Sequence, residues 1–155
     1  MTLVVRDIMD AEPVTITPDD GVETVVKRMR EHGLPGLPVV NDGGRCVGIV
    51  TDADLVIADE EGRDLHIPHY IELFGGVVFL EPLRHFEERL RKATAMTVAD
   101  LMTEDPVTIG ADASIREAGR TITERGHNRL PVVEHGRLVG VVTRVDVLEA
   151  LTREP

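Results

Sequence analysis

The residues of this chain best suited to chemistry are a threonine and an aspartate that recur together. Thr51 and Asp54 occur in the pattern Gly-x-x-Thr-x-x-Asp, and Thr143 and Asp146 repeat it near the end of the chain. A threonine at a helix start with an acid three residues on is close to a capping box, which needs no ligand. The same pattern suits a nucleotide, because a helix N-terminus and a hydroxyl favour phosphate and a carboxylate accepts both hydroxyl protons of a ribose. Both interpretations stay open for the motif alone.

The two copies of this motif have different neighbours. His127-Asn128-Arg129 in the second copy replaces Leu34-Pro35-Gly36 of the first, and Arg144 stands where the first has Asp52. Arginine binds phosphate bidentately, whereas an exposed surface arginine needs no ligand at all. We therefore expect a phosphorylated ligand to bind best beside Arg129 or Arg144.

The motif belongs to a longer internal repeat that extends from Val5 and again from Val98. Roughly two fifths of the aligned positions are identical, which is too many for chance patterning. In each copy a proline-led apolar segment predicts a strand, at residues 13–16 and 106–109. An amphipathic helix follows, then a β-hairpin that starts at Leu37-Pro38 or Leu130-Pro131, then a short helix that begins at Thr51 or Thr143. The sequence predicts an α/β (α+β) fold of two β-α-β-β-α units.

The amphipathic helices have recognisable faces and ends. Apolar residues recur at helical spacing and predict a buried stripe in each copy: Val22, Val25, Val26 and Met29, then Ile115, Ala118, Gly119 and Ile122. Asp19 or Asp20 in the first copy, and Asp112 or Ser114 in the second, are candidate N-caps. Gly33 and Gly126 suit the left-handed residue that ends a helix.

These repeats suggest three parts, namely residues 1–58, an insert at 59–95, and residues 96–155. The insert is apolar around Gly75-Gly76 and helix-like from Pro82 to Lys92, so we expect an ordered helical arm or a dimer contact. His66, His69 and His85 also lie there, but no cysteine partner or tight spacing supports a metal site. We expect these histidines to be solvated or capping residues, and no metal to bind.

Composition excludes several classes of protein. A formal net charge of −11 repels nucleic acid, and no basic stripe interrupts the acidic residues. No apolar run approaches the roughly 20 residues of a membrane helix, and residues 1–10 lack the order of a signal peptide. The single Cys46 lies in an apolar run typical of a strand and has no expected catalytic role. We expect a cytoplasmic protein that binds neither nucleic acid nor membrane.

Three duplicated motifs, Pro-Val-Thr-Ile, Leu-Pro-Val-Val and the Gly-x-x-Thr-x-x-Asp segment, resemble the CBS domain, which is named after cystathionine β-synthase and occurs in tandem pairs called Bateman modules. The resemblance implies two units packed sheet to sheet about a pseudo-twofold axis, and commonly a homodimer. It also implies an adenosine ligand in clefts between the repeats, contacted by Thr51, Asp54, Thr143 and Asp146. The walls around adenine would comprise Thr15, Ile16, Leu37, Pro38, Thr108, Ile109, Leu130 and Pro131, with Asn128, Arg129 and Arg144 beside the second copy. The alternative for each apolar wall residue is plain sheet core.

The function expected from this resemblance is a non-catalytic regulatory module that binds AMP, ADP or ATP and acts on an unidentified partner protein. The first copy lacks the arginines, which leaves its occupancy open or favours a less charged ligand such as S-adenosylmethionine. A structural dimerisation unit with empty clefts is the other alternative. We do not expect an enzyme, because no Ser/His/Asp set or paired carboxylates emerge from the sequence.

Overall fold

The computed structural model describes residues 2–55, 70–73, 76–79 and 96–153. The protein forms two compact units. The first-repeat unit comprises Val14–Asp42 and Val47–Asp105, and the second-repeat unit comprises Met1–Pro13, Gly43–Cys46 and Pro106–Pro155. The units therefore do not coincide with the sequence repeats, because each borrows a segment from outside its own repeat.

In the first-repeat unit a helix covers a small sheet. Helix α2 spans Val22–His32, and a three-stranded sheet has the order β1 (Gly36–Val40), β2 (Cys46–Thr51), β5 (Thr103–Glu104). Strands β2 and β5 are antiparallel. The strand expected at residues 13–16 is reduced to one parallel bridge between Ile16 and Val39.

The second-repeat unit has the same plan with longer strands. Its sheet has the order β6 (Ile109–Gly110), β7 (Arg129–Glu134), β8 (Arg137–Thr143), with β6 parallel and β8 antiparallel to β7. Helices α6 (Ile115–Arg125) and α7 (Arg144–Arg153) pack together, and a β-carbon at Gly119 would lie 3.4 Å from Val147. The helix and the hairpin of the predicted unit are therefore confirmed, while the first strand, predicted at 106–109, is the two-residue strand Ile109–Gly110.

The helix faces are as the periodicity predicts, while one of the caps differs. All four residues of the α2 stripe are buried, as are Ile115, Ala118 and Ile122 of α6. Gly33 and Gly126 end the helices at φ 62° and 69°. Ser114 caps α6 by accepting a hydrogen bond from Glu117 N, but the N-cap of α2 is Gly21, not Asp19 or Asp20. Asp20 instead accepts from Thr17 N in the preceding turn.

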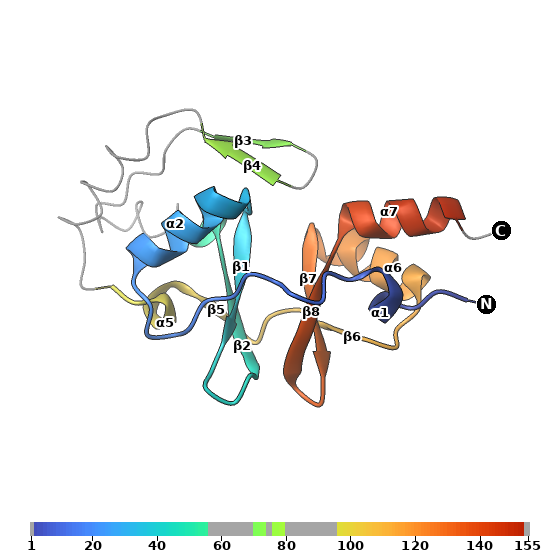
Figure 1. Ribbon diagram of the computed structural model, residues 1–155, viewed down its shortest axis with the longest axis horizontal. Helices are drawn as coiled ribbons and strands as arrows, with labels where there is room; N and C mark the ends of the chain where they lie inside the picture. Colours follow the sequence, from blue (N-terminus) through green and yellow to red (C-terminus); the bar gives the residue numbers. More distant parts are fainter. Residues whose placement is uncertain (1, 56–69, 74–75, 80–95, 154–155) are drawn as a thin grey trace. The chain divides into compact units, whose positions relative to one another are not determined.

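Each core is completed by a helix from the start of the other repeat, an exchange that periodicity did not predict. Helix α1 (Val5–Ile8) places Val5 in the core of the second-repeat unit, and α5 (Val98–Leu101) places Val98 in that of the first. Figure 1 shows blue α1 beside the orange α6, and yellow α5 in the unit of the blue α2. Backbone bonds fix both segments, from Val5 N to Ala113 O (2.9 Å) and from Val98 N to Asp20 O (2.8 Å).

The described part of the insert is extended rather than helical. Strands β3 (Tyr70–Leu73) and β4 (Gly76–Phe79) pair antiparallel, with Leu73 opposite Gly76. The helix-like stretch from Pro82 to Lys92 lies outside the described residues. In the part of the chain that the structure describes, no helix has the length and apolar character needed to cross a membrane.

Because α1 packs in the second-repeat unit, a substitution in α1 should destabilise that unit and not the first. Val5→Ala removes two buried methyl groups from the second-repeat core, and we expect the free energy of unfolding to fall by about 2 kcal/mol. Urea denaturation measures this loss, and Thr123→Ala, at an exposed position of α6 in the same unit, is the control. Native-state hydrogen exchange should show faster opening of β7 and β8. Faster opening of β1 and β2 instead would contradict the exchange.

Candidate nucleotide site

Both Thr-Asp pairs lie where a strand turns directly into a helix. Strand β8 ends at Thr143 and α7 begins at Arg144; likewise β2 ends at Thr51 and residues 52–55 are helical. Thr143 N donates to Asp146 Oδ2 (2.9 Å), and Asp146 N donates to Thr143 Oγ1 (3.1 Å). Thr51 N donates to Asp54 Oδ2 (2.8 Å), and Asp54 N donates to Thr51 Oγ1 at 3.4 Å. The reciprocal capping box expected from the sequence is therefore formed twice.

Each junction is also tied to the strand beside it. Arg144 N donates to Asn128 O (2.8 Å), and Asp52 N donates to Pro35 O at the equivalent place (3.0 Å). These bonds fix the first residue of the helix against the segment that enters the hairpin. The side chains at residues 127–129 and 143–146 therefore belong to one small region.

The two aspartates differ in how much of their hydrogen-bonding capacity is used. Asp54 Oδ1 accepts from Thr103 Oγ1 (3.1 Å), and Asp54 Oδ2 accepts from the Thr51 hydroxyl (3.2 Å) as well as from Thr51 N. Asp146 Oδ1 makes no hydrogen bond with any described residue, and the Thr143 hydroxyl donates to none of them. Since a carboxylate offers about four lone-pair positions, Asp146 keeps both an open oxygen and a donor beside it.

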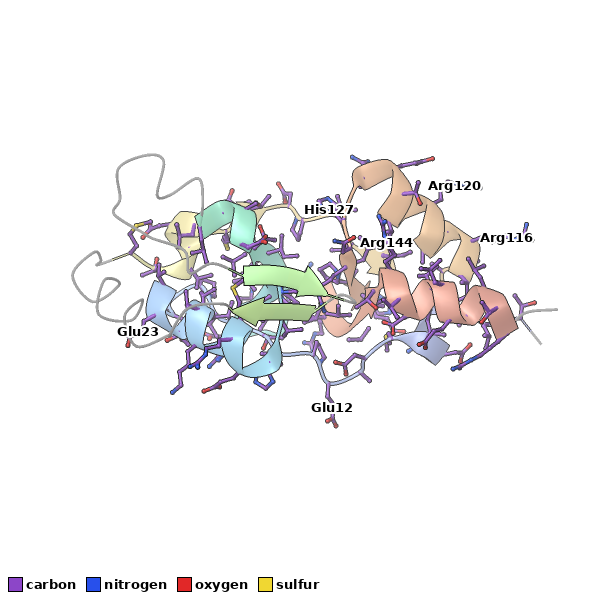
Figure 2. All side chains as sticks on the ribbon, turned by 90° about the horizontal axis from the view of Figure 1, so that it is seen from above. Glu12, Glu23, Arg116, Arg120, His127 and Arg144 are labelled. Carbon is purple, nitrogen blue, oxygen red and sulfur yellow. The ribbon has the colours of Figure 1, made fainter. Side chains whose placement is uncertain are left out.

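Among the described residues, two arginines lie next to the second pair, and Gly36 and Asp52 stand at the matched positions of the first. Arg129 pairs directly with Thr143 across β7 and β8 and is half-buried. Arg144 is exposed, and its guanidinium makes no hydrogen bond or ion pair within the described part of the chain. Figure 2 shows His127 and Arg144 near each other in this unit, with Arg116 and Arg120 on α6. An anion beside Thr143 would meet positive charge at this edge of an otherwise acidic chain.

In the first repeat, backbone crowding takes the place of that positive charge. Gly36 occupies the position of Arg129, and a β-carbon there would lie 3.1 Å from Val50 O and 3.2 Å from Thr51 Cγ2. A side chain at residue 36 would need these neighbours to shift by a few tenths of an ångström, whereas the second repeat has an arginine at the matched position. Steric crowding therefore adds to the difference in charge between the two junctions.

The expected wall residues separate into two groups. Ile16, Leu37, Ile109 and Leu130 are at most 5% exposed and belong to the two cores, and Pro38 and Pro131 are buried strand residues. Thr15 and Thr108 are partly exposed, and Thr15 O accepts a hydrogen bond from Arg28. A packing role is therefore established for the aliphatic residues, and their contact with a ligand stays a prediction.

Thr103 was not predicted from the sequence as a residue of the candidate site. Thr103 contacts Asp54 although 49 residues separate them, because β5 pairs with β2 and places Thr103 opposite Ile49. A signal exists in the repeat alignment, where Thr103 of the second copy corresponds to Asp10 of the first. The sequence reveals this difference, but the contact itself follows from the exchange of segments.

No metal site is evident where the structure can be described. Among those residues, no group of three or more His, Cys, Asp and Glu side chains could hold an ion. His66, His69 and His85 lie outside the described residues.

Comparison with known proteins identifies the family of this chain. The family model for the CBS domain matches residues 5–61 and 98–153. An uncharacterized protein of Methanocaldococcus jannaschii is 30% identical over 154 residues, covering 96% of this chain and 91% of the relative. The crystal structure of the CBS-pair protein CBSX2 from Arabidopsis thaliana has a TM-score of 0.74 at 25% identity, with complete coverage of both chains. A structure of CBSX2 in complex with AMP has a TM-score of 0.71 at 27% identity, covering 97% and 96%. The chain belongs to the CBS domain family and contains two tandem copies of the domain.

Proposed function

We propose that this chain is a non-catalytic regulatory module that binds an adenosine nucleotide at the Thr143–Asp146 junction of the second repeat. The observation that carries the proposal is the unused hydrogen-bonding capacity there. Asp146 has an open carboxylate oxygen and Thr143 an unused hydroxyl proton at the start of a ten-residue helix. The complex of the related CBSX2 with AMP supports this class of ligand.

The geometry suits the two ends of a nucleotide differently. Vicinal ribose hydroxyls can both donate to the Asp146 carboxylate, which accepts such paired donors well. The phosphate would lie toward Arg129, Arg144 and the Thr143 hydroxyl, since the first turn of α7 adds positive potential. AMP, ADP and ATP share this chemistry, while S-adenosylmethionine has the ribose but no phosphate. A titration series of these four ligands therefore distinguishes the phosphate contribution from the ribose contribution.

We infer that ligand binding favours one conformation of the module, and that this conformation acts on a partner protein. A ligand shifts such an equilibrium only as far as its affinities for the two states differ. Family membership supports a binding module rather than a catalyst, since the CBS domain model matches both repeats and the structure of CBSX2 with AMP is matched over 96% of its chain.

Asp146→Ala tests the site. We expect the affinity for AMP, measured by titration calorimetry, to fall about tenfold or more, because two charge-assisted hydrogen bonds are lost. Replacing AMP by its 2′-deoxy analogue should weaken binding to the wild type but make little difference to the variant.

Since Asp146 also caps α7, the control must remove a cap without removing the site. Ser114→Ala deletes the cap of α6 in the same unit. It should lower stability by about 1 kcal/mol and leave AMP affinity unchanged. Equal AMP affinity in wild type and Asp146→Ala would show that the aspartate is a helix cap alone.

We further propose that the module forms a homodimer through α7. The exposed large apolar side chains of the described residues are Val145, Leu148 and Leu151, which share one face of this helix. Val147 and Ala150 on the opposite face are buried in the core, while Val145, Leu148 and Leu151 are 37%, 56% and 43% exposed. A second copy offers an identical stripe, and twofold pairing would remove both from water.

Leu148→Glu should dissociate this dimer, because it places a charge in the middle of the stripe. Sedimentation velocity should give twice the mass of one chain for the wild type and the monomer mass for the variant. Thr123→Glu, an exposed position on α6, should remain dimeric. A monomeric wild type, or a Leu148→Glu variant that stays dimeric, would refute this interface.

A further inference from the structure

The two repeats differ at one matched position next to the Thr-Asp motif. In the first-repeat unit Thr103 pairs with Ile49 of β2, and in the second-repeat unit Asp10 forms the equivalent bridge with Val141 of β8. Both residues come from the exchanged segments that complete the opposite core. The backbone geometry is thus the same, and the side chain is a hydroxyl donor in one unit and a carboxylate in the other.

This difference determines how many hydrogen bonds the aspartate of each motif accepts from the protein. The Thr103 hydroxyl donates to Asp54 Oδ1, so both oxygens of that carboxylate are engaged and three bonds fill most of its lone-pair positions. Asp10 cannot donate to Asp146, because an ionised carboxylate only accepts hydrogen bonds. Its Oδ1 instead accepts from Glu12 N (2.9 Å) in its own turn.

We propose that Thr103 is a specificity-determining residue that closes the first repeat to the ligand, while Asp10 leaves the second open. A ribose reaching Asp54 must displace the Thr103 hydroxyl, whereas a ribose reaching the open oxygen of Asp146 displaces only water. This inference rests on the proposed function, since it concerns the same class of ligand.

The Thr103–Asp54 hydrogen bond also links the first site to the segment that passes from the first-repeat unit to the second-repeat unit. Thr103 and Glu104 make up β5, and Pro106 begins the second-repeat unit shortly after it. A ligand that displaces the Thr103 hydroxyl removes a side-chain tie of this short strand. Occupancy of the first site would therefore remove this side-chain bond, while the backbone pairing of Thr103 with Ile49 would remain.

Reciprocal substitutions in full-length protein test the proposal, with AMP as the probe and calorimetry as the measurement. Asp146→Ala isolates the first site, and adding Thr103→Val should raise its AMP affinity about tenfold, the value of roughly one net hydrogen bond. Thr103→Ser keeps the hydroxyl and should leave affinity as it was. Asp54→Ala isolates the second site, and adding Asp10→Thr should lower its affinity by a similar factor.

A gain in AMP affinity in Thr103→Val distinguishes a specificity-determining role from a purely structural one. Thr103 is exposed, so valine should be tolerated, with a small decrease in melting temperature. A residue with only a structural role would lose stability without gaining affinity, so unchanged or weaker AMP binding in Thr103→Val overturns the proposal. If the Asp54→Ala protein binds AMP at the second site while Thr103→Val gains nothing, this inference alone fails. If neither the wild type nor Asp54→Ala binds AMP, the proposed function fails with it.

Discussion

A single hydrogen bond organises each half of this molecule: the last backbone N–H of a strand donates to an aspartate three residues ahead. The bond turns the chain from strand to helix without an intervening loop. It also holds the aspartate side chain beside the junction, partly exposed at the start of the helix. Helix capping and ligand binding are therefore compatible roles, because a carboxylate can accept from its own backbone through one oxygen and from a ligand through the other.

Much of the fold could be predicted from local pattern. The buried stripe of α2, the glycines that end α2 and α6, and the hairpins follow from residue types and spacing, because their causes are local. The exchange of α1 and α5 could not be predicted in this way. Val5 and Val98 begin similar segments, and periodicity shows that each buries one face without showing which core receives it. The cap of α2 was missed because Asp20 bonds to Thr17 N in the preceding turn.

The Thr-Asp motifs of the candidate site could be predicted from the sequence, but the residues that contact them from other segments could not. Thr143 and Asp146 stand out because the motif is duplicated, and Arg129 stands out because it differs between the copies. Their arrangement supports the expectation that the second repeat binds a phosphorylated ligand better. Thr103 became visible only through strand pairing, since it is distant in sequence from Asp54. Ile16 and Leu130 illustrate the reverse case, where residues implied by family resemblance serve the core.

Binding of a ribose by the open oxygen of Asp146 can be observed in a crystal structure grown with saturating AMP. We expect density for the nucleotide with its ribose hydroxyls within hydrogen-bonding distance of the Asp146 carboxylate and its phosphate near Arg129 or Arg144. Ordered water alone beside Asp146, or AMP bound away from this junction, would contradict it.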